Sequence, residues 1–115
     1  MTYENDLQER ILVFVVAVCR HVKTLRTNEE NKIIRSQQFR SAASIGANYQ
    51  EAQAGTTRPD FMNKVRIALK EARETRYWLM ILDAVNDSSQ TGNLDQLIKE
   101  STELTRILGS IVNKA

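Results

Sequence analysis

The sequence predicts an all-α fold, an antiparallel up-down four-helix bundle that forms a single domain over residues 1–115. Apolar residues recur at alternating spacings of three and four through long segments, as on the buried face of an amphipathic helix. One proline and four glycines leave little turn chemistry, which indicates few, long elements. Because short connections between long helices make sequence neighbours antiparallel, an up-down bundle is the expected packing.

The first helix is expected over about residues 3–25. Its apolar residues form a seam of the kind found in bundles: Leu7, Ile11, Phe14, Val18, Val22 and Leu25. The run 11–18 is almost wholly apolar, so we expect this helix to bury more than one face. The valines in that run also suit a strand, but the longer helical periodicity outweighs this alternative.

The second helix is expected over about residues 28–54. From Thr27 to Glu30 a hydroxyl and a carboxylate have the spacing of a capping box, in which each satisfies a free backbone donor. Residues 41–52 carry many small side chains, which let another backbone approach closely. A glycine inside a helix costs about 1 kcal/mol relative to alanine, so Gly46 predicts a tight contact that offsets this loss.

The third helix is expected over about residues 59–86 and has the clearest start. Thr57 supplies a capping hydroxyl, Pro59 suits the first turn, and Asp60 lies near the positive end of the helix dipole. A seven-residue apolar repeat then continues to Leu82.

The fourth helix is expected over about residues 94–113, after a polar loop at 86–93. Its inward-facing residues recur with helical spacing: Leu94, Leu97, Ile98, Ser101, Leu104, Leu108, Ile111 and Val112.

The composition excludes several classes of protein. The single Cys19 cannot form an internal disulfide, and no cluster of cysteines and histidines has the spacing of a metal site. The acidic start lacks the basic-then-apolar order of a signal peptide. No apolar stretch approaches the roughly 18 residues that a membrane span needs. We therefore expect a cytoplasmic protein without a metal, a cofactor or a membrane partner.

Positive charge is concentrated in the middle of the chain. The net charge is only +2, but residues 32–80 carry nine basic and four acidic side chains, a net of +5. Within this part, Arg66, Lys70, Arg73 and Tyr77 fall on one narrow arc of the third helix, opposite its apolar seam. A basic stripe with an aromatic ring at one end is what a phosphate backbone or an exposed base would contact. The alternative is an ordinary solvated helix face.

Glu71, Glu74 and Trp78 lie on a flank of the same helix. Carboxylates beside apolar residues suggest a metal site or an acid–base pair. A di-iron bundle needs Glu-x-x-His on two helices, and the only histidine, His21, is in the first helix. We therefore expect these glutamates to pair with basic residues such as Arg40 or Arg76, within the chain or across an interface.

Ser44, Asn48 and Glu51 form a polar line along the second helix. No serine lies in a Gly-x-Ser-x-Gly elbow, and no glycine-rich phosphate loop is present, so the sequence predicts no enzyme activity. Asn48 and Glu51 are expected to bond the turn into the third helix and its free amides. Because buried polar groups also fix the register between helices, we interpret this line as architectural.

These residues resemble the four-helix-bundle proteins of the 23S rRNA-intervening-sequence family. The family pattern Ser-Ile-x-x-Asn-x-x-Glu, followed by Ala or Gly, is present from Ser44 to Ala52. The Asp60-Phe61 pair follows. The glutamates and tryptophan of the family's third helix are matched by Glu71, Glu74 and Trp78. The resemblance covers nearly the whole chain.

The resemblance implies a four-helix bundle that assembles into a ring-like homopentamer. Such proteins are encoded within intervening sequences of bacterial 23S rRNA genes or are free-standing in bacterial genomes. A distant relative, the accessory variability determinant of diversity-generating retroelements, is a basic pentameric barrel that works with a reverse transcriptase and nucleic acid. The family as a whole has no settled biochemical activity.

Two hypotheses about function remain. In the first, a non-enzymatic homo-oligomer binds structured RNA, or an RNA–protein complex, through basic surface on the second and third helices. Its candidate contacts are Arg35, Arg40, Arg66, Lys70 and Arg73, with Tyr77 stacking on a base. In the second, the oligomer is a scaffold for protein partners without a role in nucleic acid binding, and Trp78, Tyr77 and the fourth helix carry the contacts.

Overall fold

The computed structural model describes residues 3–55, 57–86 and 92–113, and within them the chain is a bundle of four long helices. They are α1 (Tyr3–Lys23), α2 (Glu29–Gln53), α3 (Arg58–Val85) and α5 (Leu94–Asn113). These bounds lie within two residues of the expected ones, and the valine-rich run of α1 is helical. The described residues contain no strand, which confirms the all-α fold.

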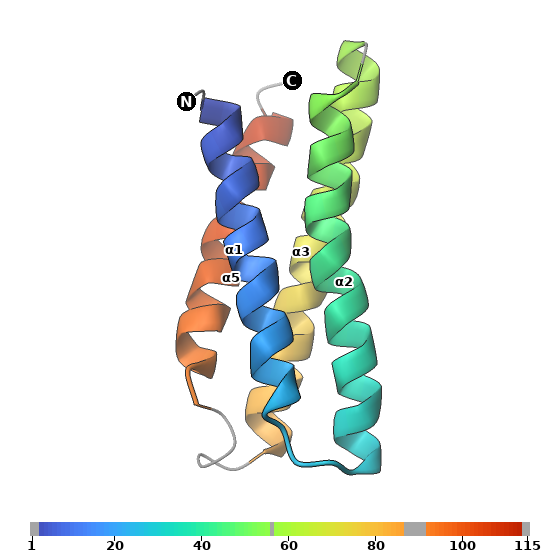
Figure 1. The fold of residues 1–115 in the computed structure, drawn as a ribbon. Coiled ribbons are helices and arrows are strands. Elements are labelled where there is room, and N and C mark those ends of the chain that lie inside the picture. The colour runs from blue at the N-terminus through green and yellow to red at the C-terminus, as the bar shows by residue number, and fades with distance from the viewer. Residues whose placement is uncertain (1–2, 56, 87–91, 114–115) are drawn as a thin grey trace.

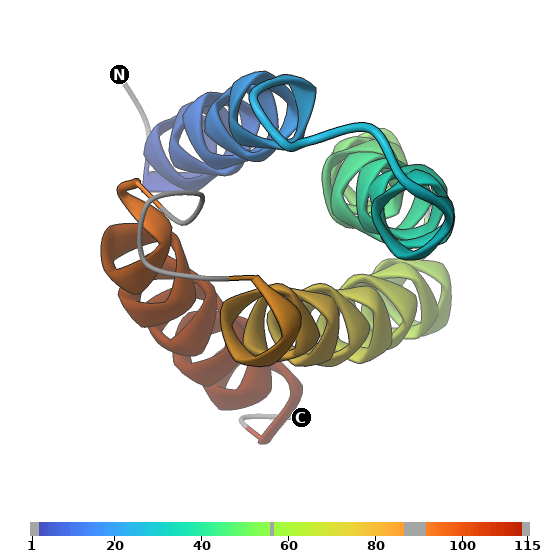
Figure 2. The ribbon, with the colours of Figure 1, turned by 90° about the horizontal axis from the view of Figure 1, so that it is seen from below.

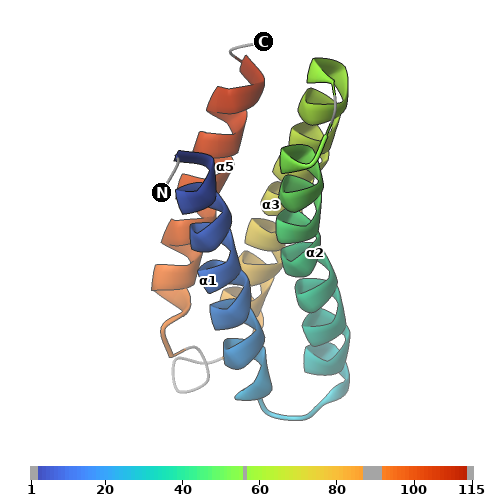
Figure 3. The same ribbon diagram turned by 45° about the horizontal axis from the view of Figure 1, so that its top comes forward.

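The helices run alternately up and down (Figure 1). The N- and C-terminal ends of the chain lie at one end of the bundle, together with the turn between α2 and α3. Viewed along the bundle, the four helices lie at the corners of a square in the order α1, α2, α3, α5 (Figure 2). The tilted view in Figure 3 separates α1 and α5 from the longer pair formed by α2 and α3. None of the described helices carries an apolar stretch long enough to span a membrane.

Most residues of the apolar seams predicted for α1, α3 and α5 are buried in the core, which α2 completes with residues such as Ile34, Ile45 and Tyr49. In α1 the whole predicted seam is buried, from Leu7 to Leu25. α1 does not bury a second face, however, and that expectation was wrong: Leu12 and Val13 expose 61% and 63% of their surface. Only α2 and α5 flank α1, so the side of α1 turned away from the bundle has no helix to cover it.

A cap one residue later than predicted starts α2. The Asn28 side chain accepts a hydrogen bond from the Asn31 backbone N–H at 2.8 Å, in the manner of an N-cap. The capping box expected from Thr27 to Glu30 is therefore wrong. α3 begins as predicted, because the Thr57 hydroxyl accepts from the Asp60 backbone N–H at 3.2 Å.

Two asparagines join three segments at the lower end of the bundle. Asn31 at the start of α2 and Asn86 just beyond α3 exchange side-chain hydrogen bonds of 3.2 Å. The Asn31 amide also donates to the Arg26 carbonyl, in the connection between α1 and α2, at 2.8 Å. Asn31 is 1% exposed, so its bonds are shielded from water.

We predict that Asn31→Ala lowers the free energy of unfolding by about 2 kcal/mol, because it removes buried hydrogen bonds and leaves the carbonyl of Arg26 with one donor fewer. Chemical denaturation followed by circular dichroism measures the change. The matched control is Asn63→Ala on the exposed face of α3, which is expected to change stability by about 0.5 kcal/mol or less. Equal effects of the two substitutions would contradict the role given to Asn31.

Candidate functional site

The polar side chains singled out in α2 and α3 meet along one seam between the two helices. Bonds at Asn31–Asn86, Gln38–Thr75, Ser44–Glu71 and Glu51–Lys64 fix α2 and α3 antiparallel along their full length. The residues in each of these pairs have numbers that add up to nearly the same value, as expected for two helices in a constant antiparallel register.

Arg40 is the centre of this seam. Its guanidinium forms an ion pair with Glu74 and a second one with Glu71 at 3.5 Å. The Glu74 carboxylate also accepts a hydrogen bond of 3.0 Å from the indole N–H of Trp78, one turn further along α3. Both carboxylates are thus held beside a cation, which is the pairing with Arg40 expected from the sequence.

Ser44, Asn48 and Glu51 continue the seam toward the turn between α2 and α3. The Ser44 hydroxyl lies 3.4 Å from a Glu71 carboxylate oxygen, and the Asn48 amide donates to both oxygens of Ser44 at 2.9 and 3.0 Å. Glu51 forms an ion pair of 2.9 Å with Lys64. The expectation that Asn48 and Glu51 bond the turn was therefore wrong. Asn48 bonds to Ser44 within α2, and Glu51 pairs with Lys64 of α3.

Three fully buried polar residues lie behind the seam. The helical pattern places Ser41 on the polar face of α2 and Thr75 in the apolar repeat of α3, but it does not single out Gln38. Gln38, Ser41 and Thr75 are each 0% exposed. The Gln38 amide donates to the Thr75 carbonyl at 3.2 Å, and the Thr75 hydroxyl donates to the Ser41 hydroxyl at 2.9 Å. Gln38 falls on the core face of α2 by helical spacing, and this position is the only signal in the sequence that could have found it.

The chemistry that the seam can carry follows from these partners. Its carboxylates belong to Glu51, Glu71 and Glu74, and each faces a lysine or an arginine. Within the described ranges, no group of three or more His, Cys, Asp or Glu side chains is arranged to hold a metal ion. The seam therefore acts through charge pairs that join two helices.

The basic residues proposed as contacts do not form one surface. Arg66, Lys70, Arg73 and Tyr77 are all exposed and follow one another along a single ridge of α3, which we call the basic ridge. It is about 16 Å long, given the rise of an α-helix. No described side chain forms an ion pair or hydrogen bond with its three cations. Tyr77 ends the ridge with 63% of its surface exposed.

Arg35 and Arg40 have other partners. The Arg35 guanidinium donates to the carbonyls of Val22 and Leu25 at 3.1 and 3.2 Å. A cation is favourable at this place because the free carbonyls at the end of a helix carry partial negative charge. Arg35 thus ties α2 to the end of α1, while Arg40 belongs to the seam described above.

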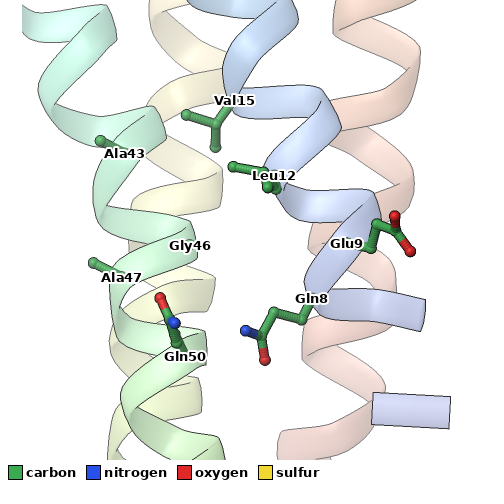
Figure 4. A pocket seen from close by; sticks show the side chains of 8 residues that line it. All are labelled: Gln8, Glu9, Leu12, Val15, Ala43, Gly46, Ala47 and Gln50. Atoms are coloured by element: carbon green, nitrogen blue, oxygen red, sulfur yellow. The ribbon is translucent and has the colours of Figure 1, made fainter. Parts of the chain in front are cut away.

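The small residues of α2 border a groove that the sequence did not predict. The groove lies between α1 and α2, has a volume of about 580 Å³, and is lined by Gln8, Glu9, Leu12, Val15, Ala43, Gly46, Ala47 and Gln50. In Figure 4 the side chains of Leu12 and Val15 extend from α1 toward α2. A Cβ added to Gly46 would lie 3.6 Å from an Ile11 methyl carbon, which is an ordinary contact. The tight contact expected at Gly46 is therefore not present within the chain.

Comparison with known proteins identifies the family of the chain. A crystal structure at 1.70 Å of a protein of unknown function from the S23 ribosomal protein family of Bacteroides thetaiotaomicron is similar, with a TM-score of 0.80 and 36% identity. The match covers 92% of this chain and 97% of that one. No protein with a curated description matches. The model of the 23S rRNA-intervening sequence protein family matches residues 4–110, and the chain therefore belongs to that family.

Proposed function

We propose that this protein is a non-enzymatic homo-oligomer that binds RNA, or an RNA–protein complex, through the basic ridge of α3. The observation that carries the proposal is the contrast between the ridge and the charges of the seam between α2 and α3. Arg40 and Lys64 are paired with glutamates, whereas Arg66, Lys70 and Arg73 face solvent without a partner among the described residues. Unpaired cations in a row attract a chain of phosphates.

The geometry of the ridge supports contact with a nucleic acid strand. Its three cations are separated by one helical turn each, and Tyr77 continues the same line at the end. Cations of this kind contact phosphates, and an exposed aromatic ring stacks on an unpaired base. Arg35 and Arg40, whose guanidinium groups are engaged elsewhere, are no longer part of the proposed contact.

The proposal includes assembly into a ring of five subunits, which the family resemblance implies. A ring brings several basic ridges together, so that its electrostatic field and its avidity for RNA exceed those of one chain with a net charge of +2. Its mass in solution is then five times the 13.1 kDa of the chain.

Reversal of two charges on the ridge tests the RNA contact. We predict that Lys70→Glu combined with Arg73→Glu removes RNA binding measured by fluorescence anisotropy. For the wild type, the logarithm of the affinity should fall with the logarithm of the salt concentration, with a slope of about 2 to 3 for each ridge that binds. The double variant Lys99→Glu with Arg106→Glu on α5 has the same change in charge and serves as the control. RNA binding that survives in the ridge variant, or is lost equally in the control, contradicts the proposal.

The alternative is a scaffold for protein partners, and the exposed apolar side chains Leu12, Phe39 and Ile33 favour it. A pull-down from a lysate, with and without nuclease, separates the two functions. RNA binding predicts that captured partners disappear after nuclease treatment. Partners that remain after the nuclease treatment, and that the double variant Lys70→Glu with Arg73→Glu also captures, would favour the scaffold.

A further inference from the structure

Large exposed apolar side chains lie on two adjacent sides of the bundle. On the side formed by α1 and α2, which we call the groove face, Leu12 and Phe39 expose 61% and 56% of their surface. On the side formed by α2 and α3, which we call the ridge face, Ile33 and Val85 expose 59% and 47%. Grouped apolar side chains on a small protein mark contact sites, whereas single ones need no explanation.

The two faces have complementary shapes. The groove face is hollow, because Ala43, Gly46 and Ala47 have little or no side chain (Figure 4). Phe39 lies one turn before Ala43 on the same side of α2, below the residues that line this hollow. The ridge face carries branched side chains instead. Since Asn31 is bonded to Asn86, Ile33 lies beside the last turn of α3, where Val85 is exposed and Ile81 is partly buried against the core.

The charges at the lower end of the two faces are opposite. Lys32 lies two turns before Phe39 on the groove face and is exposed. Glu30 lies one turn before Ile33 toward the ridge face and is also exposed. If two bundles that point in the same direction met through their groove faces, Lys32 of one copy would lie near Lys32 of the other. Contact between a groove face and a ridge face instead places Lys32 near Glu30.

We propose that the groove face of one copy receives the ridge face of a second copy, with both bundles pointing in the same direction. The inference rests on the self-association proposed above and names the surfaces that produce it. Contacts between unlike faces repeat from copy to copy and close into a ring when the angle between the faces permits. The two faces are adjacent sides of the bundle, so each added copy turns the chain of contacts in the same direction, as closure into a small ring requires. The basic ridge, which runs from Arg66 to Tyr77, is a different surface from the ridge face. It lies on the side of α3 opposite the core and stays outside both contacts.

A mixing experiment tests whether the contact joins unlike faces. Leu12→Asp disables only the groove face, and Ile33→Asp disables only the ridge face. Each variant alone is expected to sediment as a 13.1 kDa monomer. An equimolar mixture is expected to form a dimer of one copy of each and nothing larger, because one intact groove face and one intact ridge face remain. Sedimentation velocity over a series of concentrations measures the masses.

The matched control is Val13→Asp, beside Leu12 in the sequence. Val13 is 63% exposed but belongs to the side of α1 that faces α5, so its substitution should leave the wild-type assembly intact. Far-UV circular dichroism of each variant establishes that it is folded. A monomeric wild type would refute the proposed self-association itself. A wild-type oligomer that persists in both variants, that dissociates in the control, or whose two monomeric variants do not combine would overturn the assignment of the two faces.

Discussion

The antiparallel register of α2 against α3 positions the basic ridge and the ridge face of this molecule. Its energy comes from buried apolar contacts, since each large side chain removed from water contributes about 1.5–3 kcal/mol and an exposed ion pair about 1 kcal/mol or less. The polar seam selects one register of α3 against α2 over alternative registers. If α3 slid by one turn in the direction that brings Lys70 to the place of Glu74, Arg40 would face Lys70, and Glu51 would face Asp60 in place of Lys64. Both pairs would then join like charges.

This use of the polar residues bears on function. The serine and the glutamates of the family motif form contacts between α2 and α3, and the asparagine bonds to Ser44 within α2. Among the described residues, each carboxylate of the seam therefore has a partner. These ion pairs do not neutralise the charge on the outer side of α3. There, the three cations of the basic ridge and an exposed tyrosine follow one another. The proposed RNA contact therefore uses a surface of α3 that the seam holds in place but does not occupy. The proposed contact between copies uses the side on which the seam lies and the groove between α1 and α2.

The sequence predicts the helices well because their signal is local. The spacing of Leu7, Ile11 and Phe14 is sufficient to show which side of α1 is buried. Features that depend on neighbours in space were missed. The exposure of Leu12 is set by which helices flank α1, and Arg35 bonds to one carbonyl at the end of α1 and to another just beyond it. The cap of α2 is a competition between Thr27 and Asn28, two adjacent good capping residues, which a pattern alone does not decide.

A double-mutant cycle on Arg40 and Glu74 tests the central claim, that the polar seam joins α2 to α3, most directly. The free energy of unfolding is measured for the wild type, Arg40→Met, Glu74→Gln and the double variant. The account predicts that each single substitution destabilises the bundle and that the two are coupled by about 0.5–1 kcal/mol. Additive effects, with no coupling between the two positions, would contradict it.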